Sequence, residues 1–145
     1  MTETQRRVRG LIAVVDDEPS VRSSLARLLR SAEFEAATYP SGEDFLESLK
    51  TVDPDCLVLD LRMPGLDGFD VLSRLAGEGH RVPVVVLTSF PSAEVRSRAL
   101  SEGVAAFLEK PVERSTLVHA IEAAIASRST AAESHNLSIK RGAAT

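Results

Sequence analysis

The sequence predicts an α/β fold, a parallel sheet with helices packed on both faces. Two observations carry this prediction. Strand-like runs alternate with helical stripes five times between residues 11 and 127. Several of the runs are apolar at every position, which suits strands buried on both faces of a sheet. Alternation of this kind implies right-handed crossovers and parallel neighbours.

Five segments qualify as strands. Residues 11–15, 56–59 and 84–87 are uninterrupted apolar runs, and residues 105–108 form a fourth. Residues 34–39 are less apolar and include Glu35, so we expect this strand at an edge of the sheet.

Helical spacing of apolar residues fills the gaps between these strands. The five stripes are Val21, Leu25, Leu28 and Leu29; Phe45, Leu46 and Leu49; Phe69, Leu72, Leu75 and Ala76; Val95, Ala99 and Leu100; and Leu117, Ile121, Ala124 and Ile125. The fourth stripe is thin, which predicts a loosely packed helix.

The chain divides into three parts by this pattern. Residues 11–127 form the predicted domain. Residues 1–10 are an N-terminal arm whose cluster of Arg6, Arg7 and Arg9 is interpreted as solvated. Residues 128–145 have no helical stripe and are interpreted as a flexible C-terminal tail.

Composition excludes several classes of protein. The 145 residues carry 17 Lys and Arg against 21 Asp and Glu, a net charge of −4, which argues against nucleic-acid binding through bulk charge. The longest unbroken apolar run is about five residues where a membrane span needs about 20, so we expect no membrane association. The single cysteine, Cys56, fits a reducing compartment, and we expect a cytoplasmic protein.

Charged and hydroxyl side chains follow the predicted strands where each one ends. Asp16 and Asp17 follow the first strand, Asp60 the third, Thr88 the fourth and Lys110 the fifth. Since the carboxyl ends of parallel strands meet at one edge of the sheet, these side chains should gather there. Three carboxylates so close repel one another unless a hard cation such as Mg²⁺ lies between them.

The same group of side chains suits phosphoryl transfer. A metal ion and an ammonium group neutralise the charge on the transferred group, and a hydroxyl donates to one of its oxygens. An aspartate can accept the phosphoryl group, because carboxylates form aspartyl phosphates.

Four short motifs, each at a strand end, resemble the receiver domain of bacterial two-component response regulators. They are the stretches 14–18, 59–68, 87–89 and 109–111, which contain Asp16-Asp17, Asp60, Thr88 and Lys110-Pro111. The resemblance covers residues 11–127 and is nearest to the subgroup of the nitrogen-fixation regulators. It implies a flavodoxin-like, doubly wound (βα)5 fold with strand order 2-1-3-4-5.

The resemblance also implies roles for the residues at the metal site. Asp60 would be the phosphoacceptor, and Asp17, Asp60 and the backbone carbonyl of Arg62 would bind Mg²⁺. Asp16 would act through a metal-bound water.

The remaining residues would form the switch. Thr88 and Lys110 would each contact a phosphoryl oxygen, Phe107 would be the aromatic residue that moves with Thr88, and Lys110-Pro111 would be a cis peptide.

The function implied by the resemblance is a signalling switch rather than an enzyme, catalysing only its own phosphorylation and dephosphorylation. A histidine kinase or a histidine-phosphotransfer protein would donate the phosphoryl group. Phosphorylation would change the face built from the fourth helix, fifth strand and fifth helix, which would then form a weak homodimer or bind an unknown protein target. Only 18 residues follow Ser127, so we expect no DNA-binding domain and either a stand-alone receiver or an excised one.

Other interpretations stay open at this point. Asp16 and Asp17 could cap the helix that begins at Pro19, and Phe107 could be an ordinary core residue. The chain could be a receiver that binds partners without being phosphorylated. An aspartate-nucleophile phosphatase is a third class, although it requires a second Asp two residues after the first, and here the next one after Asp60 is Asp67.

Overall fold

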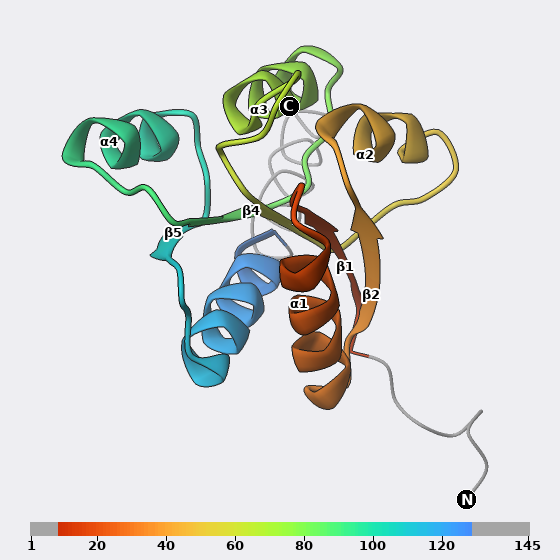
Figure 1. Ribbon diagram of the computed structural model, residues 1–145. Helices are drawn as coiled ribbons and strands as arrows, with labels where there is room; N and C mark the ends of the chain where they lie inside the picture. Colours follow the sequence, from red (N-terminus) through yellow and green to blue (C-terminus); the bar gives the residue numbers. More distant parts are fainter. Residues whose placement is uncertain (1–8, 129–145) are drawn as a thin grey trace, which may run out of the picture.

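A computed structural model describes residues 9–128 of the chain. Most of the predicted arm and tail, residues 1–8 and 129–145, lies outside the described residues. Five parallel strands form one sheet in the order β2-β1-β3-β4-β5, which confirms the expected topology (Figure 1). The strands are β1 (Leu11–Val15), β2 (Glu35–Tyr39), β3 (Cys56–Leu59), β4 (Val84–Thr88) and β5 (Ala106–Glu109).

Helices cover both faces of this sheet. They are α1 (Pro19–Ser31), α2 (Gly42–Ser48), α3 (Gly68–Gly77), α4 (Ala93–Ser101) and a last helix over residues 114–128. In Figure 1, α1 and the last helix lie on one face, and α2, α3 and α4 on the other. Within residues 9–128, no helix is long and apolar enough to cross a membrane.

The strands contribute to two separate hydrophobic cores. Ile12 and Val14 pack with α1 and the last helix, whereas Ala13 and Val15 pack with α2 and α3. This division follows from the alternation of side chains along a strand. It explains why β1, β3 and β4 are apolar at almost every position.

Residues just outside the predicted limits of 11–127 contact the domain at both ends. Arg9 is exposed, but its backbone N–H donates to Glu33 O at 2.8 Å and its guanidinium carbon lies 4.5 Å from the centre of the Phe34 ring. Arg9 also pairs with Glu122 of the last helix. Arg128 belongs to that helix rather than to the tail, and it donates to Pro54 O at 3.1 Å. The fifth strand begins one residue later than predicted.

Helix α4 has the thin core contact that its sequence predicts. Ala99 is its one buried residue, and Leu100 is 44% exposed. The helix begins with a cap in which the Ser92 side chain accepts from Val95 N at 3.1 Å. Its attachment to the sheet therefore depends little on buried apolar surface.

Candidate functional site

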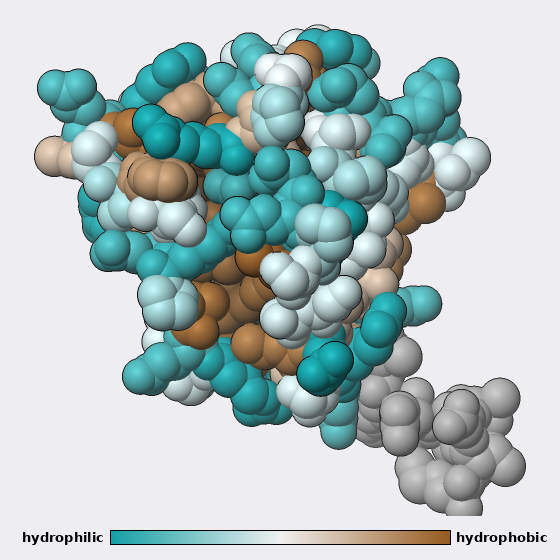
Figure 2. Space-filling view, in the orientation of Figure 1, coloured by the Kyte–Doolittle hydropathy of each residue, from teal (hydrophilic) through white to brown (hydrophobic). Residues whose placement is uncertain are grey.

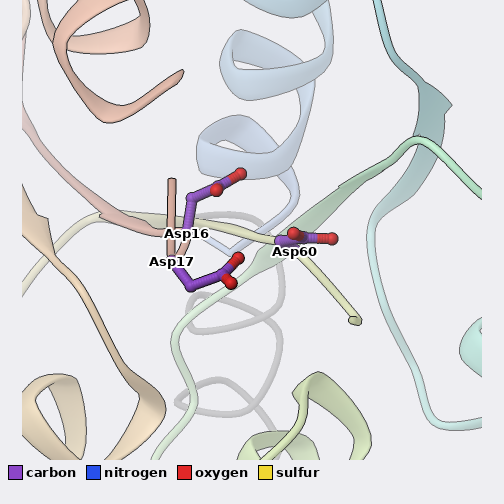
Figure 3. A group of neighbouring side chains, drawn as sticks. All are labelled: Asp16, Asp17 and Asp60. Atoms are coloured by element: carbon purple, nitrogen blue, oxygen red, sulfur yellow. The ribbon is translucent and has the colours of Figure 1, made fainter. Parts of the chain in front are cut away.

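Three carboxylates meet at the carboxyl edge of the sheet. Asp16 and Asp17 follow β1 and lie beside Asp60, which follows β3 (Figure 3). One oxygen from each lies within 4.8 Å of the others. Asp16 is 2% exposed and Asp60 7%, whereas Asp17 is exposed to solvent.

The backbone continues the sheet by one residue into this cluster. Asp60 N donates to Val15 O at 3.0 Å, and Asp16 N donates to Tyr39 O at 3.3 Å. These bonds fix the two aspartates at the same level of the sheet. Glu18, not either aspartate, is the N-cap residue of α1, so the capping interpretation of Asp16 and Asp17 is wrong.

Lys110 supplies the positive charge of the site. Its Nζ lies 2.6 Å from Asp16 Oδ2 and 3.6 Å from Asp60 Oδ2. Burial alone would lower the pKa of Lys110, but the hydrogen bond to Asp16 and the charges of Asp60 and Asp16 outweigh it and raise the pKa. Lys110 is therefore a fixed cation at neutral pH.

The pKa of Asp60 is also raised. The main cause is burial, which disfavours the charged carboxylate, and the neighbouring charges of Asp16 and Asp17 act in the same direction. Lys110 and the backbone N–H of Arg62, which donates to Asp60 Oδ1 at 3.2 Å, oppose the shift. Asp60 thus has a proton affinity above that of an ordinary surface aspartate.

Thr88 ends β4, beside the strand that leads to Asp60. It is 1% exposed, and its Oγ1 accepts a hydrogen bond from Phe90 N at 3.2 Å. Because Oγ1 is the acceptor there, its own proton remains available for a second partner. Lys110 N donates to Thr88 O at 2.8 Å, so the loops after β4 and β5 are joined at the site.

Phe107 occupies the rim of the core rather than its interior. Its half-buried ring packs against the core on the α3 side and borders a recess of about 330 Å³ between β5 and the start of α4. The guanidinium carbon of Arg96 lies 6.0 Å from the ring centre.

Two surface residues near the site follow no pattern visible in the sequence. The Arg62 side chain is exposed, and its guanidinium carbon lies 4.4 Å from the ring centre of Phe90. Phe90 is 58% exposed and lies in the loop between β4 and α4. The sequence signal that could have indicated this contact is the phenylalanine directly after Thr88-Ser89, and the sequence analysis assigned it no role.

A groove opens from Lys110 along α1. It has a volume of about 390 Å³ and is lined by Val21, Leu25 and Leu28 of α1 and by Leu87, Pro111 and Val112. Figure 2 shows hydrophobic residues in a hollow between α1 and the last helix. The Lys110–Pro111 peptide at its end is cis.

The donor atoms at the site fit a hard divalent cation. Three carboxylates within 4.8 Å leave a surplus of negative charge that one lysine does not balance. Both oxygens of Asp16 are already engaged, Oδ1 with Glu18 N at 2.9 Å and Oδ2 with Lys110. The contacts of Asp60 are longer, 3.2 Å from Arg62 N to Oδ1 and 3.6 Å from Lys110 Nζ to Oδ2, and the exposed Asp17 side chain makes no hydrogen bond or ion pair within residues 9–128. Asp17 and Asp60 are therefore better placed than Asp16 to bind a metal directly.

Comparison with known proteins supports one family. The model of the response regulator receiver domain matches residues 12–122. The chain belongs to this family. This receiver is 36% identical over 126 residues to the transcriptional regulatory protein FixJ of Bradyrhizobium diazoefficiens, a match that covers 87% of this chain and 62% of FixJ. It is 33% identical over 136 residues to the transcriptional regulatory protein TdiR of Thauera aromatica, covering 94% of this chain and 60% of TdiR.

Solved structures agree with this assignment. The receiver shares 40% identity and a TM-score of 0.73 with a response regulator receiver protein from Burkholderia phymatum, over 81% of this chain and 96% of that one. With FixJ-N it shares 35% identity and a TM-score of 0.74, over 79% of this chain and 92% of that one. The chain spans about 60% of the length of the curated relatives FixJ and TdiR.

Proposed function

We propose that this receiver accepts a phosphoryl group on Asp60 from a histidine kinase or a histidine-phosphotransfer protein. The observation that carries the proposal is the surroundings of Asp60, a nearly buried carboxylate 3.6 Å from Lys110 Nζ and next to two further aspartates. A carboxylate held beside a fixed cation and potential metal ligands has what an aspartyl-phosphate requires.

In the transfer step, a carboxylate oxygen of Asp60 attacks the phosphorus of the donor's phosphohistidine. The new O–P bond forms as the P–N bond breaks, and the electron pair of that bond stays on the imidazole nitrogen. Lys110 is 2.6 Å from Asp16 and reaches Asp60 from one side, so it can contact a phosphoryl oxygen with little movement. The reaction needs Asp60 ionised, which the charge of Lys110 favours.

Asp17, Asp60 and the backbone carbonyl of Arg62 would hold Mg²⁺, with Asp16 acting through a water. The engagement of both Asp16 oxygens supports this division between the two neighbouring aspartates. Mg²⁺, when bound, would neutralise negative charge on the phosphoryl oxygens.

The response to phosphorylation would pass through Thr88 and Phe107. The Thr88 hydroxyl would donate to a phosphoryl oxygen, which draws it away from Phe90 N, and the rim position of Phe107 leaves its ring able to turn inward. The surface of α4, β5 and the last helix would change, favouring a weak homodimer or a protein target. This is a population shift between two packings, and the sparse core contact of α4 supports it.

The domain limits and the location belong to the same proposal. Residues 11–127, extended by Arg9, Gly10 and Arg128, would form the signalling unit, and the protein would act in the cytoplasm without binding nucleic acid through this unit.

Labelling with acetyl phosphate in Mg²⁺ tests the proposal. We expect one added phosphoryl group by intact mass, placed on Asp60 by peptide mapping, and none in Asp60→Asn. The matched control is Asp44→Asn, since Asp44 is an exposed carboxylate of α2 whose side chain makes no hydrogen bond or ion pair within residues 9–128. Labelling on another residue, or undiminished labelling in EDTA, would contradict the assignment. A wild-type protein that takes no label would instead favour a binding module that works unphosphorylated.

A further inference from the structure

One side of α1 forms a basic recess that begins beside the proposed phosphorylation site. The recess has a volume of about 570 Å³ and is lined by Pro19, Arg22, Ser23, Ala26, Arg27 and Arg30 of α1 and by Thr38 of β2. The α1 positions repeat every three or four residues, so they share one face of the helix. The core-facing residues Leu25 and Leu29 belong to the adjacent face.

The recess contains three arginines, Arg22, Arg27 and Arg30, whose positive charges are not balanced by ion pairs. Among residues 9–128 no ion pair includes any of them. Arg22 donates to the backbone oxygen of Asp16 at 2.7 Å, which fixes that side chain at the end of the recess nearest the phosphorylation site.

The nearby acidic residues do not neutralise the recess. Ala36 packs with α1, so alternation along β2 places Thr38 on the α1 face and Glu35 on the opposite one. Glu18 and Glu33 lie just beyond the two ends of α1, and neither lines the recess. A chain of net charge −4 therefore concentrates positive charge along one helix face.

The length of the recess selects among anionic ligands. Arg22 and Arg30 are eight residues apart, which is about 12 Å along a helix. In an extended chain, alternate side chains are about 6.7 Å apart, so carboxylates at three alternate positions span about 13 Å. A single phosphate is too short to reach both ends. The lining also holds no aromatic residue on which a nucleotide base could stack.

The position of the recess favours an extended ligand. β2 is the edge strand of the sheet, paired with β1 on one side only, and Thr38 lines the recess from that strand. A segment lying between α1 and β2 would run beside an open strand edge, a common way in which extended peptides bind. Residues 1–8 and 129–145 contain one acidic residue each, Glu3 and Glu133, so neither stretch supplies carboxylates at three alternate positions.

We propose that the recess between α1 and β2 binds an extended acidic segment of a partner protein, with carboxylates at alternate positions facing Arg22, Arg27 and Arg30. Guanidinium groups suit this role because their planar donors match carboxylates. The proposal is independent of phosphorylation, since it uses no residue assigned to the phosphoryl group or the metal.

Fluorescence anisotropy with a labelled peptide that carries Glu at three alternate positions tests the proposal. We expect Arg27→Glu/Arg30→Glu to weaken binding about tenfold or more at low salt, since two attractive contacts become repulsive. The control is Arg74→Glu/Arg81→Glu, which makes the same change of net charge at exposed arginines away from α1 and should change binding less than twofold. Circular dichroism checks that both variants fold. If Arg27→Glu/Arg30→Glu does not fold, Arg27→Gln/Arg30→Gln is used in its place.

Two further peptides make the test specific. A peptide with Gln in place of Glu should not bind, and one with three consecutive Glu should bind at least fivefold more weakly, because consecutive side chains of an extended chain point to opposite sides. Amide shifts on titration should fall on α1 and β2. The proposal is overturned if both arginine variants lose the same amount of peptide affinity, or if the two Glu peptides bind equally well. It is also overturned if polyphosphate or an oligonucleotide binds more tightly than the peptide through the same arginines.

Discussion

Two glycines at opposite ends of α3 should respond oppositely to the same substitution. A Cβ added at Gly68 would lie 2.6 Å from Leu61 Cα and 2.8 Å from Asp60 O, both backbone atoms at the proposed phosphorylation site. A Cβ added at Gly77 would meet nothing within 4 Å. Neither glycine has a positive φ, so the difference comes from space alone.

The expected free energies follow from these contacts. Ordinary carbon contacts are about 3.5–4.0 Å, so Gly68→Ala forces the Asp60–Leu61 backbone and the start of α3 apart, and overpacking of this kind costs about 1–3 kcal/mol. Backbone atoms yield less easily than side chains, which places Gly68→Ala near 3 kcal/mol. Gly77→Ala should stabilise by about 0.5–1 kcal/mol, because alanine loses less backbone entropy in a helix.

Urea unfolding and calorimetry of the two variants measure this difference. Their separation of about 3.5–4 kcal/mol corresponds to roughly 15 °C in Tm for a domain of this size. Gly68→Ala should also weaken labelling at Asp60, because the displaced backbone includes the Asp60 carbonyl, whereas Gly77→Ala should label like wild type. The reasoning is refuted if the two variants have equal stability, or if Gly68→Ala is as stable as wild type.

Three further predictions concern ionisable groups. Because burial raises the pKa of Asp60, its ionised form opposes folding near neutral pH, so Asp60→Asn should be more stable than wild type at pH 7 in EDTA. This gain should vanish as the pH falls below about 4, where Asp60 is protonated in both states, and a gain that persists there contradicts the assignment. Lys110→Ala should cost about 2–5 kcal/mol in EDTA, since it leaves Asp16 buried without its cation, and adding Asp16→Asn should recover part of the loss in a double-mutant cycle. Burial raises the pKa of the Cys56 thiol to about 12, so iodoacetamide at pH 8 should modify it only in unfolded protein, and fast alkylation of the native state would argue against this burial. Because an unfolded cysteine titrates near 8.5, stability should also fall by about 1.4 kcal/mol per pH unit between pH 9 and 12.

Much of the fold could be predicted because the relevant signals are local. The apolar runs 11–15, 56–59 and 84–87 are strands in the structure, with β4 one residue longer than predicted. The edge position of β2 followed from Glu35, since a charged side chain is tolerated where one side of the strand is open. The contacts of Arg9 with Phe34 and of Arg128 with Pro54 could not be predicted, because each joins residues far apart in the sequence.

The cluster of acidic residues could be predicted for a different reason. Parallel strands bring their carboxyl ends to one edge, so strand topology alone places Asp16, Asp17 and Asp60 together. Topology does not specify which carboxylate oxygen of each aspartate contacts which neighbouring group. Asp16 has shorter contacts with Lys110 and Glu18 N than Asp60 has with Lys110 and Arg62 N, and this difference depends on side-chain geometry that no spacing encodes.

Helix α4 shows where hydrophobic patterning stops being informative. Its stripe of Val95, Ala99 and Leu100 predicts weak packing, and Ala99 alone is buried. The structure adds two contacts from arginines, with the guanidinium carbon of Arg98 3.8 Å from the centre of the Phe69 ring and that of Arg96 6.0 Å from Phe107. Such stacking at exposed sites contributes only about 0.5–1 kcal/mol each, and it can re-form in a shifted position because arginine side chains are long and flexible. A helix held in this way can move at low cost, which is what the proposed response to phosphorylation of Asp60 requires of α4.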